Sequence, residues 1–372
     1  MKKISLFLLL HCNICLNAQE YFLVIGTYTS GKSEGIYVYR FNTKTGSAEY
    51  VSTATGISNP SYLATSPSGK YIYAVNENGN QAQGEISAFS FDQTNGTLQH
   101  LNKQVSGDHP CYVTVHASGK WVIAGNYTGG NLAAFPVNTN GSLKPYAQSV
   151  QHKGKSVNTK RQEKPHVHAT VFSPDNKYLL VPDLGIDKVM NYRFNKESIK
   201  PLSAAAVPYI KSEPGSGPRH LEFHPNKKFL YVIAELTGKV AAYRYQDGKY
   251  TLLQLISSHS DDYTGTKGSA DIHVSPDGNF LYASNRGDAN DIAIFSIDKK
   301  TGKLKTIGFQ STLGKTPRNF MIDPTGQYLL VANQQSDNII IFKRDALTGL
   351  LTETGNKIEV PNPVCLKMIK TK

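Results

Sequence analysis

The chain has 372 residues, a length that by itself suggests two or three domains. Its 31 glycines and 21 tyrosines, with one tryptophan and only 18% charged residues, favour an all-β protein with many tight turns. The formal net charge of +12 is spread along the chain, so we expect a basic surface that favours small anionic ligands and no nucleic-acid partner.

Residues 1–18 have the pattern of a secretory signal peptide. Two lysines precede an apolar stretch over residues 4–16, and Ala18 ends the segment at a cleavage motif. The stretch is too short to span a membrane, and nothing later in the chain has a transmembrane pattern. We therefore expect cleavage after about Ala18, export to the periplasm or the extracellular space, no membrane partner, and a single domain over residues 19–372.

One sequence unit recurs along the chain, and residues 270–304 are its clearest copy. In this copy a strand leads into a Ser-Pro-Asp-Gly turn at 275–278, and a second, apolar strand ends at Asn285. A third strand follows, and a Thr-Gly turn at 301–302 leads into a fourth. The unit returns roughly every 50 residues, which is typical of β-propeller blades.

The second strand of each unit is a nearly continuous apolar run, as expected for strands that are buried on both faces. In chain order these runs occupy residues 71–76, 121–126, 178–183, 229–234, 280–285 and 328–333. The third strands alternate more regularly between apolar and polar residues. Six such units account for the middle of the chain.

The two ends of the chain supply one further unit. Residues 21–50 hold a second strand, a third strand and a Thr-Gly turn but no first strand, and residues 362–368 resemble the first strand at 59–65. We therefore predict a seven-bladed β-propeller with four-stranded antiparallel blades, in which the N- and C-terminal segments together close one blade. Cys111 and Cys365 fall in different blades, so we expect no disulfide between them.

A polar mouth is predicted at one face of this ring. In an antiparallel blade, the start of the first strand and the end of the second strand lie at the same face. Two polar insertions, residues 151–164 and 257–267, border this face and are placed to cover it. Counting from the turns, the mouth collects His168, Arg219, Arg286, Arg318, Glu77, Glu235, Asp183, Asn76, Asn126, Asn285, Asn333 and Gln334.

These residue types are suited to a small polyoxygenated anion, because guanidinium groups bind carboxylates and phosphates and amides bind hydroxyl groups. His168 is placed to act as a general acid or base. Purely structural channel mouths contain the same residue types, and Arg318 with Glu77 is equally consistent with a structural ion pair. No residue spacing indicates a metal site or a nucleotide-binding motif. The remaining histidines near the channel ends are expected to be structural: His166, His220, His224 and His273.

Six phrases after the signal segment carry a resemblance to a known family: IGTYTSGKSEGIYVY, AVNENG, PHVHATVFSPDNKYLLVPDLGIDKV, GPRHLEFHPNKKFLYVIAEL, IHVSPDGNFLYASNRG and PRNFMIDPTGQYLLVANQQSDNI. In this order they resemble the seven-bladed propeller lactonase family, which includes propeller-type 6-phosphogluconolactonases and the carboxymuconate lactonising enzyme. The resemblance implies hydrolysis of a sugar lactone, with a 6-phosphogluconolactone as the leading substrate, and no cofactor or metal.

The resemblance also assigns roles to residues. The family's proposed catalytic His, Arg, Glu and Arg match His168 in PHVH, Arg219 in GPRH, Glu235 in AEL and Arg286 in SNRG. By this hypothesis the two arginines bind the anionic group and polarise the lactone, while His168, oriented by Glu235, handles water or the ring oxygen. The surrounding residues are expected to bind substrate: Glu77, Asp183, Asn285, Arg318, Asn333 and Gln334.

Export sets this chain apart from the cytoplasmic sugar-phosphate role implied by the family, so an unphosphorylated lactone is an alternative substrate. Two other functions stay open from the sequence. One is a non-catalytic exported propeller that binds a sugar acid or a protein partner, and the other is a muconate-type lactonising enzyme. We expect a monomer.

Overall fold

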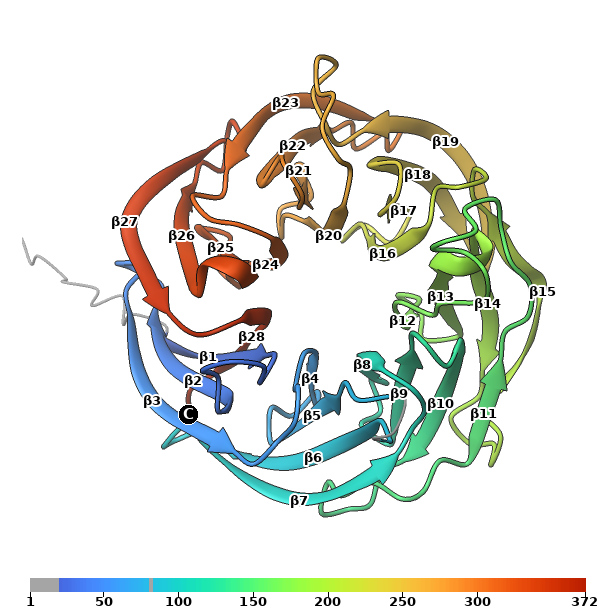
Figure 1. The fold of residues 1–372 in the computed structure, drawn as a ribbon, viewed down its shortest axis with the longest axis vertical. Coiled ribbons are helices and arrows are strands. Elements are labelled where there is room, and N and C mark those ends of the chain that lie inside the picture. Colours follow the sequence, from blue (N-terminus) through green and yellow to red (C-terminus); the bar gives the residue numbers. More distant parts are fainter. Residues whose placement is uncertain (1–19, 80–82) are drawn as a thin grey trace, which may run out of the picture.

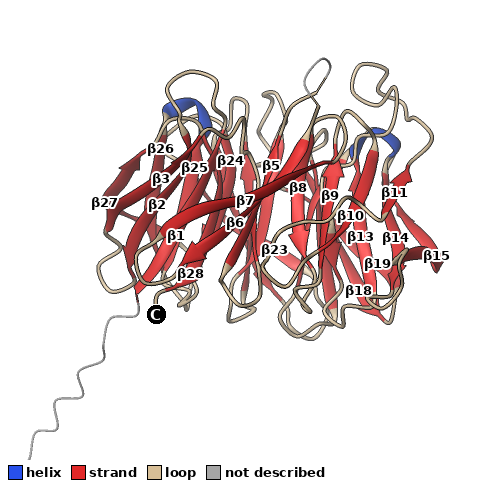
Figure 2. Cartoon of the chain, turned by 90° about the horizontal axis from the view of Figure 1, so that it is seen from below, coloured by secondary structure: helices blue, strands red, loops and turns tan. Residues whose placement is uncertain are grey.

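The computed structural model describes residues 20–79 and 83–372, which form seven four-stranded sheets around a common axis (Figure 1). All strand pairings within the blades are antiparallel. The seven-bladed β-propeller predicted from the repeat is confirmed. Seen from the side, loops emerge at both faces of the ring (Figure 2). The predicted signal peptide lies outside the described residues.

One blade joins the two ends of the chain, as expected. From the axis outward it consists of β28 (Pro363–Lys370), β1 (Glu20–Thr27), β2 (Gly35–Asn42) and β3 (Ala48–Thr55). β28 runs antiparallel to β1 with Tyr21 opposite Lys370. The last strand of the chain therefore covers an edge of β1 that would otherwise expose unpaired backbone groups.

The other six blades each come from one continuous segment, with the first strand next to the axis. Three of them are β4 (Leu63–Thr65), β5 (Tyr71–Asn76), β6 (Glu85–Asp92) and β7 (Thr97–Val105); β8 (Pro110–Val115), β9 (Trp121–Asn126), β10 (Asn131–Pro136) and β11 (Gln148–Gln151); and β12 (Val171–Phe172), β13 (Tyr178–Asp183), β14 (Lys188–Phe194) and β15 (Leu202–Lys211). The other three are β16 (Pro218–Phe223), β17 (Phe229–Ala234), β18 (Lys239–Gln246) and β19 (Lys249–Ser257); β20 (Ser269–Val274), β21 (Phe280–Asn285), β22 (Asp291–Ile297) and β23 (Leu304–Ser311); and β24 (Pro317–Ile322), β25 (Tyr328–Asn333), β26 (Asn338–Arg344) and β27 (Leu351–Glu359). Two short 3-10 helices, η1 (Leu184–Ile186) and η2 (Gln334–Ser336), follow β13 and β25.

The core lies between the blades. Every residue of β9, β13, β17, β21 and β25 is buried, in agreement with the apolar runs of the sequence. Side chains from neighbouring sheets pack together, for example Tyr231 of β17 with Leu281 of β21 and Phe295 of β22 in one cluster. Burial of each large apolar side chain contributes about 1.5–3 kcal/mol. This packing leaves the central axis to the first strands and their polar side chains.

The Ser-Pro-Asp-Gly turn at 275–278 lies at the face opposite the predicted mouth and has a structural role. Ser275 Oγ donates to Asp277 over 2.6 Å and accepts from the backbone nitrogen of Phe280 over 3.0 Å. Gly278 has a φ of 69°, in the left-handed region that favours glycine. His224 Nε2 lies 2.9 Å from the carbonyl oxygen of Gly278, so His224 ties two blades together, as expected for a structural histidine.

Cys111 and Cys365 are both buried and are not joined by a disulfide. Across the described residues we find no helix with the length and apolar character needed to cross a membrane.

Candidate active site

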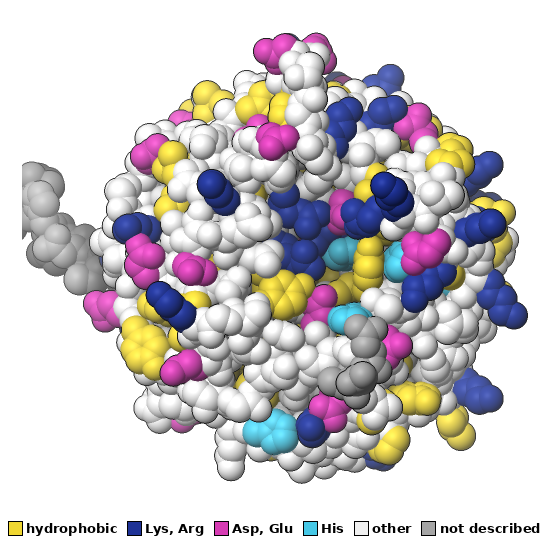
Figure 3. Space-filling view, in the orientation of Figure 1, with side chains coloured by type: hydrophobic (Ala, Val, Ile, Leu, Met, Phe, Trp, Pro, Cys, Tyr) yellow, Lys and Arg dark blue, Asp and Glu magenta, His cyan; other side chains and the backbone are white. Residues whose placement is uncertain are grey.

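A pocket of about 440 Å³ opens at the face where the sequence predicts the polar mouth. Figure 3 shows it as a hollow near the axis, with basic side chains at its centre and histidine and acidic side chains beside them. Five of the thirteen residues that line it were named as site residues from the sequence: Glu77, His168, Glu235, Arg286 and Arg318. The pocket is lined by Glu77, Cys111, Tyr127, Arg161, His168, Glu235, Leu236, Lys267, Gly268, Arg286, Gly287, Thr316 and Arg318.

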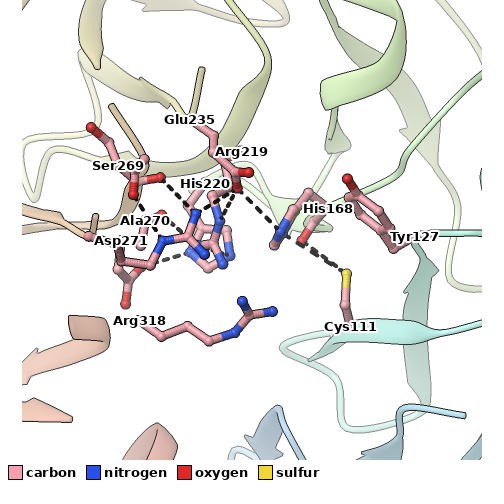
Figure 4. A network of polar contacts seen from close by, with 12 residues as sticks. Cys111, Tyr127, His168, Arg219, His220, Glu235, Ser269, Ala270, Asp271 and Arg318 are labelled. Carbon is pink, nitrogen blue, oxygen red and sulfur yellow. Dashed lines mark hydrogen bonds and ion pairs between the residues drawn. The ribbon is translucent and has the colours of Figure 1, made fainter. Parts of the chain in front are cut away.

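His168 lies just before β12, where its backbone nitrogen donates to Pro182 of the neighbouring strand over 3.0 Å. Its buried ring has Nε2 4.0 Å from a carboxylate oxygen of Glu235 and Nδ1 4.0 Å from the sulfur of Cys111 (Figure 4). Burial, and then the positive charge of Arg219, hold the pKa of His168 well below its usual range. The imidazole is therefore neutral at neutral pH and able to accept a proton.

Glu235 follows β17 and is the carboxylate on which three arginines converge. Its Oε2 lies 3.0 Å from Nε of Arg219 and 3.0 Å from Nη2 of Arg286, and its Oε1 lies 2.6 Å from Nη2 of Arg161. Burial alone would raise the pKa of Glu235, but the charges of Arg286 and Arg219 hold it well below the usual range. Glu235 is therefore a permanent anion that holds the arginines in place.

Arg286 and Arg219 occupy different depths. Arg286 follows β21, and its Nε donates to the carbonyl oxygen of Gly268 over 2.9 Å, with 16% of its side chain exposed to the pocket. Arg219 of β16 is only 2% exposed and lines a smaller cavity behind the main pocket. Its Nη1 donates to the carbonyl oxygen of Ala270 over 2.5 Å and lies 3.3 Å from Nε2 of His220. Arg219 thus supports the site from behind.

A buried network lies beneath Arg219 and has Asp271 of β20 at its centre. His220 Nδ1 lies 2.7 Å from Asp271 Oδ1, and His273 Nε2 lies 3.2 Å from Asp271 Oδ2. Asn319 of β24 donates to the same carboxylate. His220 and His273 are thus packed and hydrogen-bonded, as expected. The sequence count missed Asp271, because it lies one position beyond the ring that was counted.

Glu77 and Arg318 are joined through Tyr28 and not by the direct ion pair considered from the sequence. Tyr28 donates to Glu77 over 2.8 Å and accepts from Nη2 of Arg318 over 2.9 Å. Ser61 also donates to Glu77. Burial is the main cause that raises the pKa of Tyr28. The positive charge of Arg318 lowers this pKa and the Glu77 carboxylate raises it, and the net shift is upward. The phenol therefore keeps its proton. Tyr28 comes from the loop after β1, where the register count stopped one residue short.

Four of the expected substrate-binding residues do not line the pocket. Asp183 is fully buried and accepts from the backbone nitrogens of His166 and Gly185 over 2.7 and 3.0 Å. Asn285 donates to the carbonyl oxygen of Ser258 over 2.6 Å, and Asn333 donates to that of Thr312 over 2.9 Å. Gln334 is the first residue of η2 and is not among the residues that line the pocket.

The physical reason is the alternation of side chains along a strand. The Asn or Asp residue that ends a second strand points sideways and bonds to the loop that enters its blade or to the next strand of the blade. Asn76 and Asn126 behave in the same way, accepting from Ser87 and Ser106 over 2.8 Å each. Asparagine recurs at this position in four blades, and such a recurrence in the sequence indicates a structural role and not a substrate-binding one.

Arg161, Lys267 and Tyr127 line the pocket although the sequence analysis assigned them no role. Arg161 and Lys267 come from or border the two insertions that were predicted to reach the mouth, and the structure confirms that both loops do so. Tyr127 follows β9 and stacks on His166 with ring centres 4.5 Å apart. His166 Nε2 also lies 3.1 Å from Glu163, which makes it a packed histidine, as expected.

Comparisons with known proteins agree with this geometry. The family described as "Lactonase, 7-bladed beta-propeller" matches residues 22–368. The chain is 42% identical to a 6-phosphogluconolactonase of Formosa agariphila over 93% of this chain and 99% of that protein. It is 36% identical to the 6-phosphogluconolactonase of Bacillus subtilis over 94% of this chain and 99% of the relative.

A solved structure is similar as well. The periplasmic gluconolactonase of Pseudomonas aeruginosa superposes with a TM-score of 0.90 at 36% identity, covering 95% of this chain and 100% of that one. With a complete seven-bladed ring, a match over nearly all of its length and several close relatives, the chain belongs to the seven-bladed β-propeller lactonase family.

Proposed function

We propose that this protein is an exported lactonase that hydrolyses a sugar lactone of the 6-phosphogluconolactone type, without a cofactor. The observation that carries the proposal is that a neutral His168 and the guanidinium of Arg286 face the same pocket. A volume of about 440 Å³ suits a single sugar ring. The names of the relatives support the substrate class, and the signal-peptide pattern of residues 1–18 supports export.

The proposed reaction starts with a water molecule in the pocket. His168 takes a proton from this water as its oxygen attacks the lactone carbonyl carbon. Arg286 donates to the oxyanion that forms on the carbonyl oxygen. When the tetrahedral intermediate collapses, the bond between the carbonyl carbon and the ring oxygen breaks, and the imidazolium of His168 returns the proton to that oxygen. The product is an open-chain hydroxy acid, and its new carboxyl group then releases the second proton of the water to solvent, which leaves the carboxylate.

Glu235 is assigned a supporting role in this reaction. Its depressed pKa makes it a poor proton acceptor at neutral pH, whereas its bonds to Arg219 and Arg286 keep the guanidinium of Arg286 directed at the pocket. The carboxylate also offsets the charge that His168 gains when it takes a proton, since the two groups are 4.0 Å apart.

A direct test is the hydrolysis of 6-phosphoglucono-δ-lactone and glucono-δ-lactone by the purified protein, followed by acid release and corrected for spontaneous opening. We expect His168→Ala to lower kcat by about 10²–10⁴-fold and Arg286→Ala by about 10²–10³-fold. His100→Ala, on the exposed strand β7, is the matched control. Wild-type rates no higher than those of the two site variants would reject the lactonase assignment, and product binding without turnover would favour a non-catalytic sugar-acid binder.

A further inference from the structure

We propose that Arg161, rather than Arg219, is the second arginine that contacts the substrate, and that it selects lactones carrying an anionic group, a phosphate or a carboxylate. This inference rests on the proposed lactonase function and extends it to the source of substrate selectivity. It reassigns a role that the sequence resemblance gives to Arg219. The three arginines on Glu235 direct their remaining hydrogen-bond donors at different surroundings.

The donors on two of the three guanidinium nitrogens of Arg219, Nε and Nη1, are directed at protein groups. Its Nε donates to Glu235 over 3.0 Å, and its Nη1 donates to the carbonyl oxygen of Ala270 and faces Nε2 of His220. The side chain is 2% exposed and does not line the main pocket. A substrate in this pocket reaches Arg286 and Arg161 before it reaches Arg219, which holds Glu235 from behind.

Arg161, in contrast to Arg219, is exposed to the main pocket. It lines the pocket, and 43% of its side chain is exposed. In the described part of the chain, its guanidinium group makes hydrogen bonds through Nη2, to Glu235 over 2.6 Å and to the hydroxyl of Tyr127 over 3.3 Å. The guanidinium group carries five N–H donors in a planar fork, so Nε and Nη1 keep donors that are free to face a ligand.

The loop that carries Arg161 is anchored, although the guanidinium group of Arg161 is exposed. Gln162, the next residue, is fully buried, and its Nε2 donates over 2.8 Å both to the carbonyl oxygen of Leu184 and to Asp187. Ser156 of the same loop donates to Asp187 over 2.5 Å. The loop is thus anchored on η1 and its cap, so movement of the Arg161 guanidinium requires only side-chain rotation.

Glu235 can release Arg161 without being left unpaired. The carboxylate keeps Arg219 and Arg286, each at 3.0 Å, when the Arg161 guanidinium turns to a ligand. The pocket already has an excess of positive charge, because its two carboxylates face four basic side chains: Arg161, Lys267, Arg286 and Arg318. An anionic substituent therefore gains charge-assisted hydrogen bonds at little cost to the site.

The test compares an anionic and a neutral substrate. For Arg161→Gln we expect kcat/KM on 6-phosphoglucono-δ-lactone to fall at least ten-fold, mainly through KM, and kcat/KM on neutral glucono-δ-lactone to change less than three-fold. Arg161→Lys should restore part of the loss, and the difference should shrink in high salt. Lys160→Ala, the adjacent exposed residue, is the matched control for lost surface charge. Equal losses on both lactones, or no loss on either, would overturn the inference.

Binding of the products separates this inference from the lactonase assignment. If the wild-type protein hydrolyses neither lactone, the assignment fails, and calorimetry with 6-phosphogluconate and gluconate then tests Arg161 alone. We expect the wild type to bind 6-phosphogluconate at least ten-fold more tightly than gluconate and Arg161→Gln to lose this preference. A preference that survives in Arg161→Gln would contradict the inference, whatever the enzymatic result.

Discussion

The Nδ1 atom of His220 lies 2.7 Å from an oxygen of Asp271, on the neighbouring blade, and this contact decides which ring nitrogen carries the proton. Burial, and then the charge of Arg219, lower the pKa of His220 to about 4, so the ring is neutral at physiological pH. With the proton on Nδ1, Nε2 is an acceptor and faces Nη1 of Arg219 over 3.3 Å. Asp271 therefore orients Arg219 through His220.

The first prediction concerns this carboxylate. Asp271→Asn should lower the free energy of unfolding by about 3 kcal/mol, because it leaves buried histidine donors and a charge without their partner. It should also reduce kcat, since Arg219 and Glu235 lose their support. Denaturant unfolding and lactone kinetics measure the two effects, with Asp247→Asn in an exposed outer turn as control. A variant as stable and active as the wild type would show that the Asp271 network has no such role.

The second prediction concerns the dependence of stability on pH. Burial opposes the charge on His273, but Asp271 and Glu222 outweigh this effect and raise the pKa of His273 to about 10. In the unfolded chain the value returns to about 6.5. The stabilisation is therefore complete below about pH 6.5 and is lost as the pH rises toward 10. The denaturant midpoint of the wild type should fall over this pH range. The midpoint of the His273→Gln variant should fall less over the same range. Identical slopes in wild type and variant would contradict the assignment.

The third prediction concerns the pH profile of hydrolysis. Since the pKa of His168 lies well below its usual range, the base stays neutral, and kcat/KM should not decline until the pH is well below 6.5. Arg318 also contributes to lowering this pKa, so Arg318→Gln should move the acidic limb to higher pH, whereas Glu235→Gln should move it lower. Profiles for the three proteins, corrected for spontaneous opening, decide the matter. An acidic limb that is insensitive to both charges would mean that another group titrates.

The fourth prediction concerns closure of the ring. Deleting residues 363–372 removes β28 and exposes an edge of β1 along its whole length. We expect loss of the cooperative thermal transition and aggregation of the shortened chain. Deleting only residues 371–372 leaves β28 intact and should change the melting temperature little. A cooperative transition in the longer deletion at the wild-type temperature would show that the ring does not depend on β28.

The fold could be predicted from the sequence because the same unit recurs in every blade. Apolar second strands, turn residues and the split unit at the ends all point to the same ring. The register count also brought His168, Glu235 and Arg286 to one mouth, since these residues follow directly from strand pairing. It failed for Asp183, Asn285 and Asn333, because a count of positions does not tell which way a side chain points at the end of a strand.

Residues outside the strands were harder to foresee. Arg161 reaches Glu235 from a loop whose course is set by Gln162 and Asp187, and no periodic pattern encodes such contacts. Tyr28, which lies between Glu77 and Arg318, could not be predicted either. Its position depends on the course of the loop after β1 and not on the repeat. A repeat predicts the scaffold, whereas the contacts that differ between blades require the structure.

The pairing of β28 with β1 also has a consequence for the order of events during synthesis. The strand that leaves the ribosome first waits for a partner encoded by the last ten residues of the chain, and at about 5–20 residues per second this delay is tens of seconds. The circular arrangement therefore cannot be completed before residues 363–370 have been synthesised. Until then an edge of β1 stays unpaired, and it is open to pairing with other chains.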